Sequence, residues 1–185
     1  MISDILTEAE HKMKASVEHA REEFGGIRTG RAHPAMFNKI LVDYYGAPTP
    51  LQQLATFQVP EARTVLISPF DRSSMHAIEK AIRDSDLGVN PADDGNVIRL
   101  VMPQLTEERR REYIKLARHK AEEARVAIRA NRRHAVDAVK KLEKSKEVGE
   151  DEATRAEKQL DTVTKKYEEH VNELLKAKEA ELLEV

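Results

Sequence analysis

The sequence predicts an α+β protein in which a small mixed α/β domain is inserted into a long three-helix bundle. Apolar residues with helical periodicity fill both ends of the chain, and a segment rich in β-branched residues and turn signals lies between them. Only 4% of the residues are aromatic, whereas 35% are charged. This composition favours long solvated helices over a large sheet core.

The first helix is expected over residues 2–27. Apolar residues recur there every three or four positions, which is the spacing of one helical face. They are Ile2, Ile5, Ala9, Met13, Val17, Ala20, Phe24 and Ile27. The glycine pair at 25–26 weakens the pattern, and Gly30 is expected to stop it.

Residues 31–105 are expected to form the inserted α/β domain. β-branched and aromatic residues predict strands over 39–45, 63–68 and 97–102. The sequence GAPTP at 46–50 indicates a turn. A helix should begin at Asp71–Ser74 and close at Gly88.

Two more long helices follow, one from Thr106 to about Lys146 and one from Glu150 onward, separated by Gly149. Each of the three long helices has a single apolar stripe, so all three bury their stripes if residues 1–30 and 106–185 form one bundle. The chain crosses between bundle and insert near 30–34 and 103–105, which suggests a hinge. A single rigid body is the alternative, because short paired linkers can be stiff.

Positive charge concentrates on the second long helix. Residues 106–148 hold 14 basic and 8 acidic residues, a net charge of +6, although the whole chain has a net charge of −2. Many of these basic residues follow three- or four-residue steps along one helical face. They are Arg111, Lys115, Arg118, Arg125, Arg129, Arg132 and Lys140, flanked by Arg110 and Arg133. The planar guanidinium group of arginine can donate two hydrogen bonds to one phosphate. Because few aromatic residues are interleaved, the pattern favours folded RNA as the ligand over single strands whose bases stack on aromatic rings. The alternative is a solvated face balanced by acids on neighbouring helices.

Several functional classes are excluded or unsupported. The chain has no cysteine, which excludes a disulfide framework and a thiolate nucleophile. The seven histidines are scattered and no paired acid and base stands out, so we expect no enzyme, no metal site and no cofactor. No run approaches the ~18 apolar residues of a membrane span, and no signal peptide is evident, so we expect a cytoplasmic protein.

A series of short motifs, in order and with matching spacing, closely resembles the ribosome recycling factors of bacteria and organelles. The most specific are RTGRAHP at 28–34 and LTEERR at 105–110. Further matches lie at 42–46, 49–51, 59–64, 78–82, 85–88, 90–91, 94–95, 98–100, 126–129, 132–133 and 140–144. The resemblance covers nearly the whole chain. One departure is Gln104, where the family often has a second proline.

The resemblance implies an L-shaped monomer that binds the post-termination ribosome, mainly through the bundle on large-subunit ribosomal RNA. With elongation factor G and its GTP hydrolysis, such a factor separates the subunits and itself hydrolyses nothing. Combined with the basic face, it implies RNA contacts at Arg28, Arg31, Arg110, Arg118, Arg125, Arg129, Arg132 and Arg133. It also implies a hinge at Gly30, Ala32, Pro103, Gln104 and Leu105.

Two other functions are open from the residues alone. A structural adaptor would bind a protein through a largely apolar interface, and its binding would respond weakly to salt. A general nucleic-acid binder would bind unrelated RNA about as well as ribosomes. Salt dependence and RNA competition therefore separate the three hypotheses.

Overall fold

The computed structural model describes residues 1–27 and 29–184, and Arg28 and Val185 lie outside that part. The chain divides into two compact units. One unit comprises Met1–Arg28 and Glu107–Val185, and the other comprises Thr29–Thr106.

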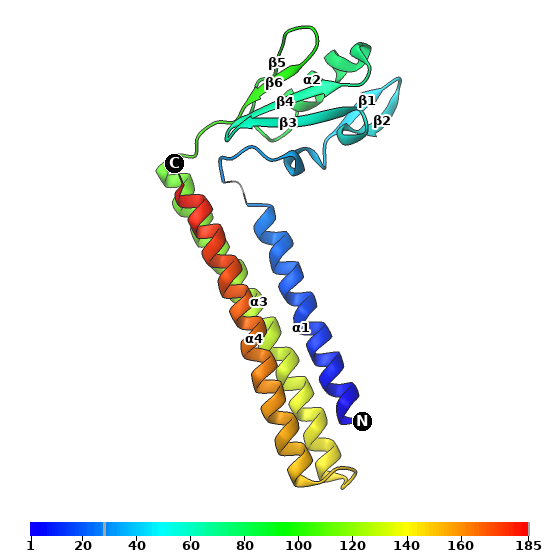
Figure 1. The fold of residues 1–185 in the computed structure, drawn as a ribbon, viewed down its shortest axis with the longest axis vertical. Coiled ribbons are helices and arrows are strands. Elements are labelled where there is room, and N and C mark those ends of the chain that lie inside the picture. The colour runs from blue at the N-terminus through cyan, green and yellow to red at the C-terminus, as the bar shows by residue number, and fades with distance from the viewer. Residues whose placement is uncertain (28, 185) are drawn as a thin grey trace. The chain divides into compact units, whose positions relative to one another are not determined.

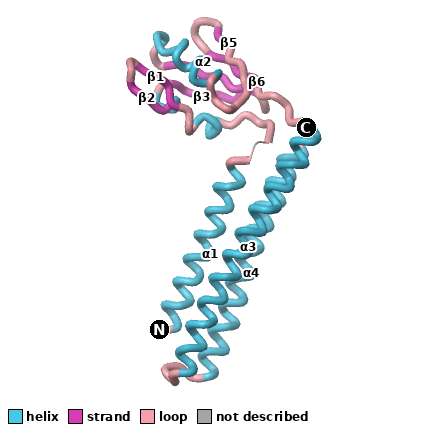
Figure 2. The backbone as a smooth tube through the Cα atoms, turned by 180° about the vertical axis from the view of Figure 1, so that it is seen from behind, coloured by secondary structure: helices cyan, strands magenta, loops and turns pink. Residues whose placement is uncertain are grey.

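The first unit is a bundle of three long helices, α1 (Ile2–Gly25), α3 (Glu107–Lys144) and α4 (Glu150–Leu183). The helices lie side by side in both views, and a short turn joins α3 to α4 (Figures 1 and 2). Met13, Ile128 and Leu160 are nearly or fully buried, one from each helix. The three apolar stripes therefore meet in one core, as their periodicity predicts.

Small residues let α3 approach its neighbours closely. Ala117, Ala121 and Ala124 are buried on α3, and Ala153 and Ala156 are buried on α4. Alanine has the highest helix propensity and occupies little volume, so the two longest helices pack without losing helical stability. The polar faces are left for charged side chains.

The first helix ends earlier than expected. α1 stops at Gly25 and Gly26 forms its C-cap, whereas the sequence placed the end of the helical segment at Gly30. Ile27 is buried nevertheless, so its apolar spacing reflects packing after the helix rather than another helical turn.

The second unit contains a four-stranded antiparallel sheet in the order β3-β4-β6-β5 and a separate hairpin of β1 and β2. Its strands are β1 (Leu41–Tyr44), β2 (Ala47–Pro50), β3 (Ala55–Glu61), β4 (Thr64–Pro69), β5 (Ala92–Asp93) and β6 (Ile98–Val101). Helix α2 (Met75–Arg83) contributes Ile78 and Ile82 to a core with Phe37 and Ile67, all fully buried.

Three predictions for this unit need correction. Residues 47–50 form β2, because the chain turns at Tyr45 and Gly46, both with positive φ, and then pairs with β1. Prolines are tolerated there since β2 pairs on one side only. Strands β3 and β5 were not predicted. Helix α2 ends at Arg83, five residues before Gly88.

Both ends of the second unit are anchored on its β3–β4 turn. The backbone N–H of Ala32 donates to the carbonyl of Ala62 at 2.7 Å, and the N–H of Met102 donates to the carbonyl of Arg63 at 2.7 Å. Ala32 and Met102 are also buried in the core of this unit. Within residues 1–27 and 29–184, no helix is both long and apolar enough to cross a membrane.

Candidate nucleic-acid interface

Helix α3 carries an arginine row, Arg118, Arg125, Arg129 and Arg132, and each member contacts a polar side chain of α4. Arg118 donates to Glu179 at 2.7 Å, Arg125 to Asn172 at 2.7 Å, Arg129 to Glu168 at 2.7 Å and Arg132 to Asp161 at 2.6 Å. The acids of α4 therefore balance this face in part, as the alternative reading of the charge pattern expected.

The antiparallel packing of the two helices sets these pairs. From Arg118 the row advances by seven and then four residues, and the partners on α4 step back by seven and then four residues from Glu179. Both steps return to the same helical face. One register therefore places Arg118, Arg125 and Arg129 beside their acceptors, and Arg132, three residues further on, reaches Asp161, seven residues before Glu168.

The geometry of these pairs leaves donors for a second acceptor. Arg118, Arg129 and Arg132 each use Nε toward α4, and the terminal nitrogens of Arg118 and Arg132 have no partner among the described residues. Their side chains are 65%, 51% and 39% exposed, respectively. Exposed ion pairs of this kind contribute roughly 0.2–1 kcal/mol each. The bonds through Nε orient the guanidinium groups of Arg118 and Arg132. A phosphate can take two donors from such a fork.

The two flanking arginines differ from the row. Arg133 is exposed, and no carboxylate of the described chain lies within ion-pair distance of it. Arg110 lies in the first turn of α3 and is half-buried, and its buried Nε has no hydrogen-bond partner in the described part of the chain. Six of the eight predicted RNA-contacting arginines thus lie on α3.

The other two predicted arginines do not belong to α3. Arg31 lies in the second unit, is exposed, and its backbone N–H donates to Thr29 Oγ1 at 3.4 Å. Arg28 lies outside the described residues. The RNA role of both is still a prediction.

The residues expected at the hinge all fall within the second unit. Gly30 has φ +80°, and a Cβ there would lie 3.4 Å from Leu105 Cγ, so the two chain crossings contact each other at this point. Pro103 and Gln104 are exposed, whereas Ala32 is buried and hydrogen-bonded.

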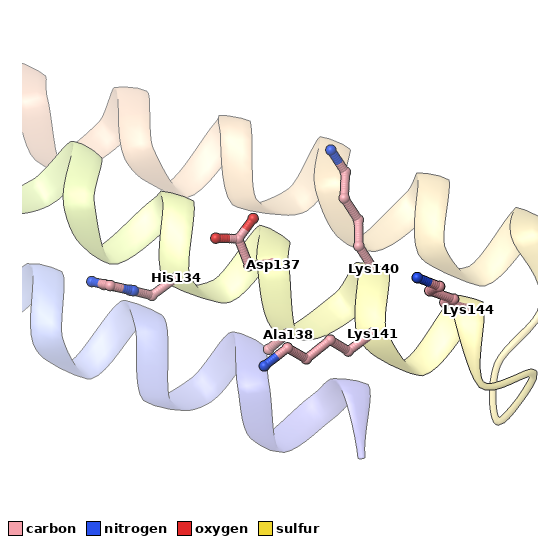
Figure 3. A pocket seen from close by; sticks show the side chains of 6 residues that line it. All are labelled: His134, Asp137, Ala138, Lys140, Lys141 and Lys144. Carbon is pink, nitrogen blue, oxygen red and sulfur yellow. The ribbon is translucent and has the colours of Figure 1, made fainter.

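A lysine cluster, Lys140, Lys141 and Lys144, lies near the C-terminal end of α3, and the sequence analysis placed only Lys140 of the three on the basic face. These lysines line an open pocket of about 510 Å³ together with His134, Asp137 and Ala138, and all six side chains come from α3 (Figure 3). The charge count of the segment contained the signal, since three lysines fall within five residues. Among the described residues, no group of three or more histidine, aspartate or glutamate side chains is arranged to hold a metal ion.

Comparison with known proteins identifies the family. A model of the family described as ribosome recycling factor matches residues 20–183. The chain belongs to the ribosome recycling factor family. It is 68% identical over 184 residues to a ribosome-recycling factor of Cutibacterium acnes and 66% identical over 185 residues to one of Acidothermus cellulolyticus, with 100% of each chain covered in both cases.

Solved structures of the same family share the fold. A solution structure of the ribosome recycling factor matches with a TM-score of 0.78 and 44% identity, covering 100% of this chain and 98% of the other. Another match, with a TM-score of 0.67 and 42% identity over 100% of both chains, comes from models of the T. thermophilus factor and E. coli elongation factor G bound to the E. coli post-termination complex. These relatives confirm the α+β fold and the family assignment.

Proposed function

We propose that the chain binds the post-termination ribosome through α3 and, with elongation factor G and GTP, promotes separation of the ribosomal subunits. The observation that carries this proposal is the arginine row, whose guanidinium groups are oriented by α4 and keep donors toward solvent. The family membership of the chain supports the same function.

The RNA of the large subunit is the proposed contact. Phosphates spaced along a folded RNA backbone suit a linear row of forked cations, whereas an apolar protein partner would gain little from it. The linkers around Gly30 and Pro103–Leu105 are proposed to let the α/β unit reorient when the translocase acts on it. We further propose that the chain acts as a cytoplasmic monomer, without a cofactor and without catalysing a reaction itself.

The test is a subunit-separation assay by light scattering, with post-termination ribosomes, elongation factor G and GTP. The variant Arg129→Ala/Arg132→Ala should separate subunits more slowly than the wild type at a factor concentration that does not saturate ribosomes. Arg21→Ala/Arg155→Ala removes the same charge from exposed positions on α1 and α4 and should match the wild type. Equal rates for all three proteins would remove α3 from the mechanism.

A further inference from the structure

The charge at the C-terminal end of α3 differs in kind from that of the arginine row. Each row arginine contacts a side chain of α4, but Lys140, Lys141 and Lys144 make no hydrogen bond or ion pair through their ammonium groups within the described residues. Asp137 is the only carboxylate of the pocket lining, and it too lies beyond ion-pair distance of the three lysines. Cations without a carboxylate partner are available to an external anion.

Neighbouring acids do not neutralise the lysine cluster. The first turn of α4 holds Glu150, Asp151 and Glu152, which complement the positive end of that helix. On α1, Asp4 contacts the terminal amino group and Glu8 pairs with Lys12. None of these five acids is within ion-pair distance of the cluster in the described chain.

The lysine cluster extends the arginine row along the same helix. Lys140 lies eight residues beyond Arg132, which corresponds to ~12 Å along the helix axis. Lys144 follows one turn later, while Lys141 extends past Ala138 on another side of α3 (Figure 3). The cluster therefore widens the basic face where the row ends.

We infer that the lysine cluster is a second phosphate-binding surface, which holds the RNA backbone beyond the stretch covered by the arginine row. This inference rests on the proposed function and adds residues to it. Lysine acts as a compact point charge on phosphate, and the imidazole of His134 adds a hydrogen-bond donor. The pocket lining has no phenylalanine, tyrosine or tryptophan, which fits backbone contacts rather than stacked bases.

The first test uses the unaltered protein and purified large subunits. Acetylation by a small amine-reactive reagent, read by mass spectrometry, should fall several-fold at Lys140, Lys141 and Lys144 when subunits are bound. The exposed lysines at 158, 165 and 176 lie on α4, lack ion pairs among the described residues, and should react equally in both states. Equal reactivity of the cluster in both states would overturn the inference.

The second test measures the salt dependence of binding. Each phosphate contact contributes about 0.9 to the slope of log affinity against log salt, so raising salt from about 50 to 200 mM should weaken the wild type about 40-fold more than Lys140→Ala/Lys141→Ala/Lys144→Ala. The matched triple replacement at 158, 165 and 176 should behave as the wild type.

The outcomes separate this inference from the proposed function. Protection of the cluster with an unchanged slope would show that bound subunits shield these lysines without phosphate contacts, which would contradict the inference. If the wild type binds and the triple variant keeps the same slope, phosphate binding by the lysine cluster is refuted, but the proposed function is not. If the wild type does not bind large subunits, both proposals fail together.

Discussion

Replacing Glu79 by glutamine is expected to stabilise the α/β unit at neutral pH. Glu79 lies on α2, is only 8% exposed, and its Oε1 is buried without a hydrogen-bond partner among the described residues. Burial and then a hydrogen bond with Asp93 raise the pKa of Glu79 above its ordinary value. His76 and Arg83 oppose this rise in the pKa. The folded unit thus favours the protonated form of this carboxyl group.

The sign of the pH dependence follows from this shift. Above pH 4.5, the ordinary pKa of Glu79, the unfolded chain releases a proton that the folded unit retains, so stability falls as pH rises through the raised pKa. The pH dependence due to Asp93 has the opposite sign. Its pKa is lowered in the folded unit, so the stability contributed by its ionised form is lost as pH falls through that pKa. Glutamine keeps an N–H donor toward Asp93 and removes only the loss of stability that comes from ionisation of Glu79.

The expected magnitude follows from the cost of burying a charge. Glutamine keeps the buried Oε1 but carries no charge, and leaving a buried charged group short of a partner costs about 1–3 kcal/mol or more, so Glu79→Gln should gain about that amount at neutral pH and little near pH 4. Hydrogen exchange of the α2 amides reports on this unit separately from the bundle. Glu61→Gln, at an exposed position in the same unit, is the control. A gain that is absent, or that does not change between pH 4 and pH 8, would refute this reasoning.

Two further predictions concern packing and backbone conformation. Ile128→Ala removes a fully buried side chain from the bundle and should cost about 2–5 kcal/mol in denaturant unfolding followed by helical circular dichroism, whereas Val126→Ala, at a position 55% exposed, should change stability little. Gly30→Ala should lower thermal stability by about 1–2 kcal/mol, because its φ of +80° disfavours a Cβ, which would also meet Leu105. Gly25→Ala, at a helix end with open space, should be neutral or stabilising, and the same effect at both glycines would contradict the account.

The long helices were predictable because their signals are local. An apolar residue every three or four positions, with glycine at the ends, fixes α1, α3 and α4 within a few residues. The insert was harder to predict, since several of its strands are short and lie at sheet edges. β2 holds Pro48 and Pro50, which look like turn residues until β1 is seen to pair with it. β5 has only two residues.

The basic face was predictable, but its charge balance was not. Periodicity alone places Arg118, Arg129 and Arg132 together on α3. Their partners lie from 29 to 61 residues away on α4, and the register between the helices depends on the turn at 145–149. Lys140 was predicted on the basic face, but its grouping with Lys141 and Lys144 was not, because only the packed bundle reveals which cations lack a carboxylate partner.

The most direct test of the α3 interface is the salt dependence of binding to purified large subunits. Two phosphate contacts contribute about 1.8 to the slope of log affinity against log salt, so raising salt from about 50 to 200 mM should weaken the wild type about 12-fold more than Arg129→Ala/Arg132→Ala. Arg21→Ala/Arg155→Ala should keep the wild-type slope. Parallel slopes for wild type and Arg129→Ala/Arg132→Ala would show that the arginine row does not bind RNA phosphates.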